Sequence, residues 1–314
     1  MDARRTTGWR ARLGATVLAL IAVTAGCSSG ATEHSAPSHA DAVVVASFNF
    51  PESTLLAEIY AQALEHAGVP VRREFDLGIR ELVQPAMRQG LVDVVPEYLG
   101  TALVSSAPGA EVDWADAAAV LGALRRTLAP SKLVALQPAA ASDQNGFAVT
   151  RATAARLRVH TLTELAALEP RLILGGPSEC PVRPYCRVGL RRLYGLEVKS
   201  FVAIDDEAQR AAALAEGVID VAVTFTTDGQ LATGELVLLR DDRGLQPSER
   251  VVPIVSTRVV DRYGARVTST LNAVSAVLDS PSLRFLNWRV SVLGKDVAAE
   301  ASGWLRRHGL LGGR

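Results

Sequence analysis

The chain alternates between short apolar runs and longer segments in which apolar residues recur every three or four positions. The short runs, rich in valine, predict buried strands, and the longer periodicity predicts amphipathic helices. In the first part of the chain this pattern gives strands over residues 42–46, 69–75 and 91–95, separated by helices. A strand–helix–strand repeat is typical of a parallel sheet with helices on its faces. The first part is therefore predicted to be an α/β lobe.

One stretch, residues 90–103, combines a strand with a polar and aromatic corner. The strand is expected to end at Pro96, and Glu97 and Tyr98 follow it. A strand of this kind delivers its last side chains to the rim of a sheet, where ligands bind in open α/β folds. Two interpretations of this corner remain open: Tyr98 caps the hydrophobic core and Glu97 starts a helix, or the Tyr98 ring forms one wall of a binding site.

A second α/β series begins after a polar loop in the middle of the chain. Its predicted strands are residues 147–150, 172–174, 198–203, 218–223 and 235–239. The strand after Gly217 repeats the arrangement that follows Gly90 and runs into a corner that contains Phe225. A strand at residues 250–256, interrupted by Pro253, is expected to lead back to the first series, and the remainder is almost wholly helical in pattern.

Two α/β lobes joined by two strand crossings predict a hinged binding protein with a ligand cleft between the lobes. We expect the first lobe to comprise residues 42–146 and 252–314, and the second lobe to comprise residues 147–251.

Residues 1–27 are predicted to be a secretory signal. Four arginines precede an uncharged run over residues 13–25, which is too short to span a bilayer comfortably. The small residues before Cys27 resemble a bacterial lipobox, in which the cysteine is lipidated and becomes the new N-terminus. The alternative is an ordinary signal peptide that is cut nearby. Residues 28–41 lack apolar periodicity and are expected to be a flexible tether between the membrane and the folded body.

The overall composition excludes a nucleic-acid-binding face. The chain has 33 basic and 33 acidic residues, and 48% of its 314 residues are hydrophobic. Without residues 1–27, which carry four arginines and one aspartate, 29 basic and 32 acidic residues remain. The mature protein is therefore mildly acidic, with the balance of an ordinary soluble globular protein.

Cys180 and Cys186 are the two other cysteines of the chain. In a protein outside the cytoplasm this pair is expected to form a local disulfide. A zinc site would need four ligands, and no further cysteine or histidine lies nearby in the sequence. A nucleophilic cysteine is a third interpretation, but it would leave its neighbour unexplained.

Several motifs occur in an order that resembles one family. They are Ser47-Phe-Asn-Phe-Pro-Glu, Leu55-Leu-Ala-Glu-Ile-Tyr-Ala-Gln-Ala-Leu, Leu77-Gly-Ile-Arg-Glu, Pro96-Glu-Tyr-Leu-Gly-Thr-Ala-Leu and Thr226-Thr-Asp-Gly. Together they resemble the substrate-binding proteins of ABC importers for glycine betaine, choline and carnitine, over about residues 43–311. The resemblance implies a periplasmic-binding-protein fold of the two-crossing kind (type II), and a protein that delivers its ligand to a membrane permease and its ATPase subunit.

The resemblance also implies a binding site. In the family, aromatic rings surround the quaternary ammonium, which they attract by cation–π forces of roughly 0.5–2 kcal/mol per ring. The expected ligand-binding residues are Phe48, Tyr98, Thr101, Asn145, Phe147, Arg183, Phe225 and Thr226. Tyr98 matches a ring of the family's box and Thr101 a residue that contacts the ligand carboxylate. Arg183 falls near a carboxylate-binding arginine.

Departures from the family's pattern affect the expected ligand. Phe147 and Phe225 stand where relatives usually have tyrosine, and Phe48 stands where they often have lysine. A fourth box tyrosine is missing, and the best match falls in residues 211–213, which are alanines. Phe147 and Phe225 also flank apolar strands, so they could be core residues. We expect these changes to weaken a standard betaine site or to reshape it for a larger, more apolar ligand.

Other classes of function fit the sequence less well. An enzyme would need a nucleophile and base or a metal cluster near the cleft. His66, His160 and His308 do not lie beside the expected cleft loops. A sensor would need a further partner. We therefore expect a monomeric binding protein that is not an enzyme, needs no cofactor or metal, and lies outside the cell on a lipid anchor.

Overall fold

The computed structural model describes residues 42–168 and 172–312. The predicted signal segment, Cys27 and the tether lie outside the described residues. No helix in these two ranges is long and apolar enough to cross a membrane.

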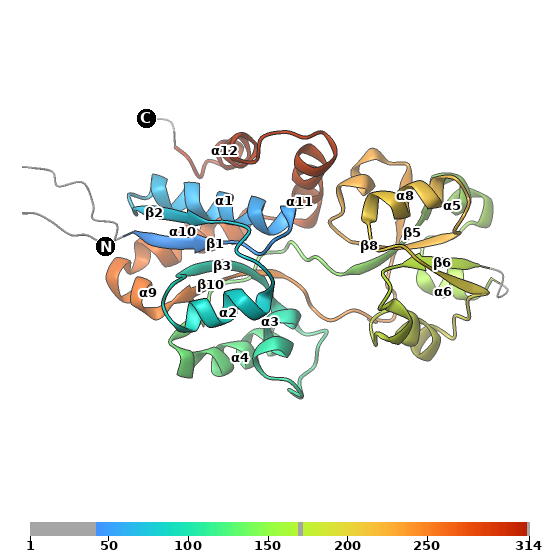
Figure 1. Cartoon of the computed structure of the whole chain (residues 1–314), viewed down its shortest axis with the longest axis horizontal. Helices are drawn as coiled ribbons and strands as arrows, with labels where there is room; N and C mark the ends of the chain where they lie inside the picture. Colours follow the sequence, from blue (N-terminus) through green and yellow to red (C-terminus); the bar gives the residue numbers. More distant parts are fainter. Residues whose placement is uncertain (1–41, 169–171, 313–314) are drawn as a thin grey trace, which may run out of the picture. The chain divides into compact units, whose positions relative to one another are not determined.

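The first lobe is built on a five-stranded sheet with the order β2-β1-β3-β10-β4 (Figure 1). Its strands are β1 (Val43–Ala46), β2 (Val71–Glu74), β3 (Val94–Tyr98), β4 (Leu133–Ala135) and β10 (Val251–Ser256). Strand β1 pairs in parallel with β2 and β3, whereas β10 is antiparallel to β3 and β4. The last strand therefore enters a sheet whose other members lie more than a hundred residues earlier in the chain.

Helices cover both faces of the first sheet (Figure 1). They are α1 (Pro51–His66), α2 (Arg80–Arg88), α3 (Leu99–Ser106), α4 (Ala117–Leu128), α9 (Thr257–Tyr263), α10 (Ala265–Val277), α11 (Ser280–Asn287) and α12 (Val297–Arg307), with short helices η1 (Ala129–Ser131) and η5 (Trp288–Val292). One hydrophobic cluster joins α1, α10 and α12 to the sheet, and the other joins α2, α3 and α4 to its opposite face. Pro51 suits the first turn of α1, where its missing N–H costs nothing.

The second lobe has its own five-stranded sheet with the order β7-β6-β8-β5-β9. The strands are β5 (Asn145–Thr150), β6 (Ile173–Gly176), β7 (Ser200–Ala203), β8 (Val221–Phe225) and β9 (Leu236–Leu239). The helices are α5 (Arg151–Leu157), α6 (Leu162–Ala166), α7 (Arg187–Gly189) and α8 (Glu207–Ala215), with η2 (Cys180–Val182), η3 (Leu190–Tyr194) and η4 (Gly229–Thr233). A separate hydrophobic core lies between this sheet and its helices.

The two-lobed type II fold expected from the sequence is confirmed. The chain leaves the first sheet after β4 and enters the second at β5, and it returns between β9 and β10. We call residues 136–144 the first crossing and residues 240–250 the second crossing. The first crossing ends where β5 begins, at Asn145, and the second ends where β10 begins, at Val251.

The expectation that prolines interrupt two strands was wrong. Pro96 lies inside β3 and Pro253 lies inside β10, and the two residues face each other across the antiparallel pair. Proline has no backbone N–H, so neither residue can donate a hydrogen bond to the opposite strand. Because the two prolines face each other, neither leaves an N–H of the other without an acceptor. The strand therefore continues to Tyr98, and α3 begins at Leu99, two residues after the helix start at Glu97 that one interpretation of this corner implied.

The two lobes also meet away from the crossings. Helix α11 and η5 of the first lobe contact η4 of the second. A Cβ atom on Gly229 would lie 2.6 Å from the backbone nitrogen of Trp288, so only glycine permits this approach. Arg284 in α11 donates two hydrogen bonds, of 3.1 and 2.8 Å, to the carbonyl of Thr226. This contact is a third link between the lobes.

Candidate ligand-binding site

Three aromatic rings lie together at the ends of β1 and β3. The Phe48 and Phe50 rings stack with centroids 5.9 Å apart, and Phe50 and Tyr98 stack at 6.3 Å. Tyr98 is 7% exposed and Phe48 is 2% exposed, and each ring belongs to a hydrophobic cluster of the first lobe, Tyr98 to the one with α1 and Phe48 to the one with α2 and α3. The structure thus brings together two of the predicted site residues. Sequence reasoning missed Phe50, although it stands two positions after Phe48 in the motif that carried the resemblance.

A basic side chain already occupies part of this aromatic cluster. The Arg80 guanidinium carbon lies 4.6 Å from the centroid of the Phe48 ring. Arg80 also donates hydrogen bonds of 2.8 and 2.9 Å to the two carboxylate oxygens of Glu97. The charge of Arg80 is therefore balanced by the protein itself.

Glu52, at the start of α1, accepts hydrogen bonds from three parts of the chain. They come from the Tyr98 hydroxyl at 2.5 Å, the Thr227 hydroxyl at 2.6 Å and the Asn287 side-chain amide at 2.5 Å. Thr227 belongs to the second lobe, so Glu52 links the lobes. Burial raises the pKa of Glu52 although these three hydrogen bonds lower it.

A second carboxyl group, Asp143, lies in the first crossing near Glu52. Its oxygen accepts a hydrogen bond of 3.3 Å from the backbone N–H of Thr227. Burial, and next the negative charge of Glu52, raise the pKa of Asp143 well above its usual range. Two buried acids and Thr227 therefore form one polar cluster at the junction of the lobes.

Thr101 hydrogen-bonds to a residue of the second crossing. Its backbone N–H donates to Glu249 at 3.0 Å, and its hydroxyl donates to the other oxygen of Glu249 at 2.9 Å. Burial raises the pKa of Glu249 to about 7, whereas its hydrogen bonds from Thr101 lower it.

Sequence reasoning missed Glu52, Asp143 and Glu249. Only Glu52 carried a signal, as the last residue of the motif that begins at Ser47.

The predicted residues of the second lobe have different environments. Phe225, at the end of β8, is 44% exposed, and Asn145 is its partner in the neighbouring strand. Phe147 is 1% exposed and packs in the core of the second lobe, which agrees with the core interpretation left open above. Thr226 exchanges hydrogen bonds with Gln144 of the first crossing, so it fastens β8 to that crossing. Their roles toward a ligand stay predictions.

Arg183 lies in the loop that Cys180 and Cys186 close. These cysteines form the expected disulfide, with Cα atoms 5.3 Å apart. Arg183 is exposed in this loop. The described residues contain no group of three or more histidine, cysteine, aspartate or glutamate side chains placed to hold a metal ion.

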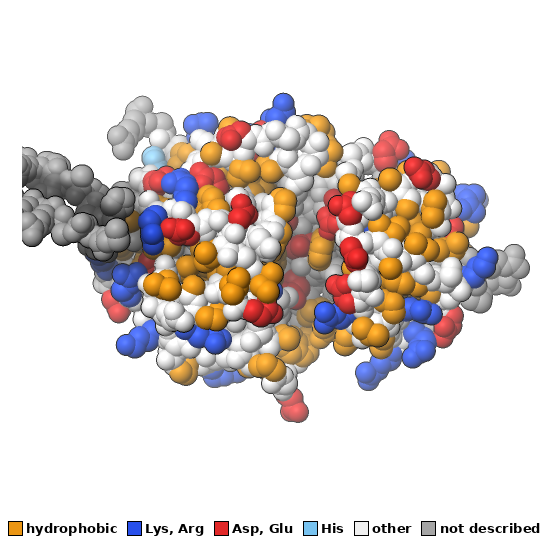
Figure 2. All heavy atoms as spheres, in the orientation of Figure 1, with side chains coloured by type: hydrophobic (Ala, Val, Ile, Leu, Met, Phe, Trp, Pro, Cys, Tyr) orange, Lys and Arg blue, Asp and Glu red, His pale blue; other side chains and the backbone are white. Residues whose placement is uncertain are grey.

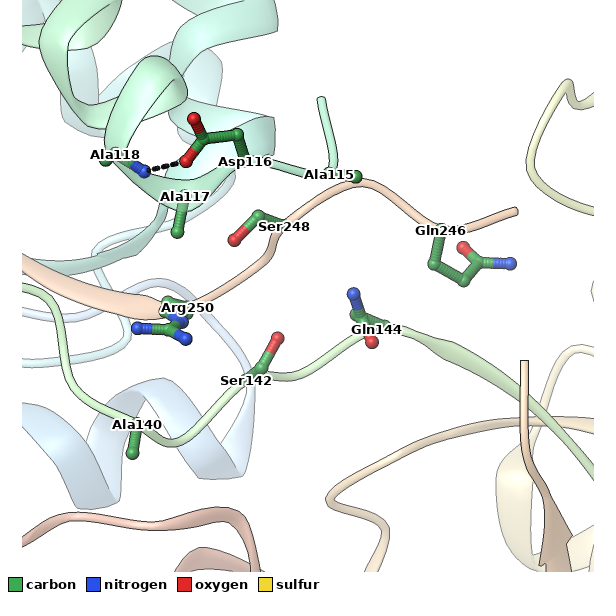
Figure 3. Close-up of a pocket in the computed structure, with 10 residues that line it drawn as sticks. All are labelled: Ala115, Asp116, Ala117, Ala118, Ala140, Ser142, Gln144, Gln246, Ser248 and Arg250. Carbon is green, nitrogen blue, oxygen red and sulfur yellow. Dashed lines mark hydrogen bonds between the residues drawn. The ribbon is translucent and has the colours of Figure 1, made fainter. Parts of the chain in front are cut away.

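An open cavity of about 630 Å³ lies beside the two crossings (Figure 3). Its polar lining comes from Ser142 and Gln144 of the first crossing, Gln246, Ser248 and Arg250 of the second, and Asp116 at the start of α4. None of the ligand-binding residues expected from the sequence lines it. The cavity does, however, contain both neighbours of Glu249 in the chain.

Acidic side chains predominate around the junction of the lobes. Figure 2 shows them along the hollow between the lobes on the face in view. Glu207, at the start of α8, has a pKa raised to about 7 by burial and then by the nearby charge of Asp228, with Arg210 acting against both.

A comparison with known families shows to which family the chain belongs. A model of the substrate-binding domain of ABC-type glycine betaine transport systems (OpuAC) matches residues 41–307. The chain belongs to this family. The family resemblance predicted from the sequence motifs is thereby confirmed.

Individual relatives agree with this assignment. The chain is 29% identical to the glycine betaine-binding protein YehZ of Escherichia coli (strain K12) over 271 residues, which cover 82% of this chain and 88% of that protein. It is 24% identical to the ergothioneine transport permease/ergothioneine binding protein EgtU of Helicobacter pylori (strain G27), covering 85% of this chain but only 48% of that longer protein. The solved structure of apo YehZ superposes with a TM-score of 0.75 at 26% identity, covering 86% of this chain and 99% of that one.

Membership settles the class of function. Proteins of this family bind a small solute outside the cytoplasm for an ABC permease. The chain is therefore a substrate-binding transport protein and not an enzyme.

Proposed function

We propose that the protein captures a quaternary-ammonium solute of the choline, glycine betaine or carnitine type and delivers it to its permease. The observation that carries this proposal is the stack of Phe48, Phe50 and Tyr98 beside a group of carboxylates. A quaternary ammonium donates no N–H hydrogen bond, so ring faces and negative charges are the groups that attract it. The family assignment supports the same ligand class.

In this proposal the ligand enters when the lobes separate at the crossings, and closure covers it. Tyr98 and Phe50 contact the cationic end from the first lobe. Phe225 and Asn145 approach it from the second, where Phe225 presents an exposed ring. Arg183 holds an anionic end where the ligand has one.

A screen of solutes tests the ligand class. Purified protein is melted with choline, glycine betaine, carnitine and ergothioneine, and with apolar aromatic solutes that carry no cation. A ligand that binds the folded state raises the melting temperature by mass action. The proposal expects the largest shift with a quaternary ammonium compound, and mass spectrometry should recover that compound unchanged. A shift only with uncharged aromatic solutes would instead support the larger, more apolar ligand as the second candidate.

We also propose that Cys27 carries a lipid and that the mature protein works as a monomer on the outer face of the cytoplasmic membrane. The sequence around Cys27 and the tether that follows it support this. Mass spectrometry of the protein from membranes should show a lipid on Cys27. A soluble mature protein whose N-terminus lies elsewhere would contradict it.

A further inference from the structure

The start of α3 is occupied by the second crossing. The backbone N–H of Leu99 donates to the Arg250 carbonyl at 3.1 Å, and that of Gly100 donates to the Ser248 carbonyl at 3.0 Å. The third N–H, that of Thr101, donates to the Glu249 carboxylate. A helix start with free N–H groups is a good site for a carboxylate. Here the protein's own carboxylate takes that place.

Gly100 makes this arrangement possible. A Cβ atom at this position would lie 2.9 Å from the nearer oxygen of Glu249 and 3.2 Å from the Ser248 carbonyl oxygen. The second crossing can therefore lie directly against the first turn of α3. Because the Thr101 hydroxyl also donates to Glu249, the side chain is fixed by two donors of one residue.

The cations near Glu249 differ in how far they are paired: Arg250, the next residue in the chain, is exposed and lines the cavity beside the crossings. Glu97 and Arg80 are the charged groups that act on it from β3 and α2, and they are paired with each other. In the second lobe, Arg210 is buried and donates to the backbone carbonyls of Val223, Ile204 and Asp205. The guanidinium groups of Arg80 and Arg210 are therefore committed to partners in the protein, and Arg250 is the cation from which Glu249 has to shield the start of α3.

Glu249 is joined to the corner that carries Tyr98 through its hydrogen bonds with Thr101. Arg80, whose charge acts on Glu249, stacks over Phe48, and Thr101 follows Tyr98 by three residues on the same strand–helix corner. A ligand that placed its cation on these rings would bring its other end toward this corner. A carboxylate there would meet Glu249, whereas a hydroxyl would not be repelled.

We propose that Glu249 determines specificity: its carboxylate occupies the start of α3, so that the site prefers a cation without a carboxylate, such as choline, over a zwitterion such as glycine betaine. This inference rests on the proposed function, and it adds the subclass of ligand and the residue that selects it.

Isothermal titration calorimetry at pH 8 tests the inference with choline and glycine betaine as probes. The wild-type protein is expected to bind choline at least tenfold more tightly than glycine betaine. Glu249→Gln keeps an oxygen that can accept from Thr101 but removes the charge, and it should reduce this preference at least tenfold. Glu216→Gln, which removes an exposed carboxylate from the second lobe, should leave the preference unchanged.

A second readout separates selection from a merely structural role. Lowering the pH from 8 to 5.5 protonates Glu249 and should strengthen betaine binding by the wild type but not by Glu249→Gln. Equal or tighter binding of glycine betaine by the wild type at pH 8 would overturn the inference while leaving the proposed function intact. An unchanged preference in a folded Glu249→Gln would overturn it as well. If neither solute binds the wild type, the proposed function fails and the inference fails with it.

Discussion

At the residue scale, Glu52 shows how much depends on one side chain. Glu52 is 8% exposed and accepts three hydrogen bonds. The donors are Tyr98 at the end of β3, Thr227 in the second lobe and Asn287 in α11. A buried carboxylate is tolerated only when hydrogen bonds replace its hydration. The motif around Ser47 could suggest that Glu52 matters. It could not show these partners, because they lie 46, 175 and 235 residues away.

We predict that Thr227→Val destabilises the protein by about 1–3 kcal/mol. The substitution removes a hydroxyl that donates to a buried carboxyl group and leaves that acceptor with one partner fewer. Urea denaturation measures the free energy of unfolding. Thr233→Val is the control, because the Thr233 hydroxyl bonds only with exposed backbone groups of Gln230 and Glu235, which water can satisfy instead, so its loss should cost less than about 0.5 kcal/mol. Equal effects of both substitutions would show that the bond to Glu52 contributes nothing.

Glu249 makes a prediction about pH. Folded protein retains its proton up to about pH 7, whereas the unfolded chain releases it near the ordinary value of 4.5. The folded state thus binds more protons between these values, so the free energy of unfolding falls as the pH rises through this window. For this group the fall is on the order of 3 kcal/mol.

Glu249→Gln should therefore flatten the pH dependence of stability between pH 5 and 8 relative to the wild type. Thermal or urea denaturation at several pH values measures it, and Glu216→Gln should retain the wild-type slope. Parallel profiles for wild type and Glu249→Gln would mean that this carboxyl group titrates normally in the folded protein.

At the element scale, the order of strands and helices was predictable, but the residues at which several of them begin or end were not. Apolar runs located every strand of the first lobe except β4, which is three residues long. Pro96 and Pro253 suggested breaks because each lacks an N–H. Their pairing across β3 and β10 is a long-range fact that local sequence does not contain. Helix α3 begins at Leu99 rather than at Glu97, because β3 continues through Pro96 to Tyr98. Gly100, which resembles a turn residue, lies inside this helix, where its small size allows contact with the second crossing.

The link between η4 and η5 gives a prediction of its own. Gly229→Ala should destabilise the protein by about 1–3 kcal/mol, because the added methyl group would overlap the backbone of Trp288. Gly122→Ala is the matched control: it lies inside α4, where the new methyl group would be 3.5 Å from the end of the Arg126 side chain. Alanine there should stabilise by about 0.5–1 kcal/mol. The two changes in the free energy of unfolding should therefore have opposite signs. If Gly229→Ala left the free energy of unfolding unchanged, the contact between Gly229 and Trp288 could separate without cost.

At the scale of the whole molecule, the two-lobed fold followed from two α/β series and two crossings. The binding site followed less well. Motif positions predicted Phe48, Tyr98 and Phe147 as ligand-binding residues, and all three belong to hydrophobic clusters. Thr226 fastens a strand to a crossing. The acidic groups at the junction come from α1, both crossings and α8, and only the folded chain brings them together.

The proposed function requires that the stack of Phe48, Phe50 and Tyr98 binds a quaternary ammonium. Calorimetric titration of choline and glycine betaine into wild type, Tyr98→Ala and Tyr98→Phe tests it most directly. Tyr98→Phe keeps the ring and loses the hydrogen bond to Glu52, so it separates the ring from the hydroxyl. We expect saturable binding of at least one solute by the wild type, at least tenfold weaker binding by Tyr98→Ala and a smaller loss with Tyr98→Phe. Wild-type affinity in a folded Tyr98→Ala, or no binding of either solute by the wild type, would contradict the claim.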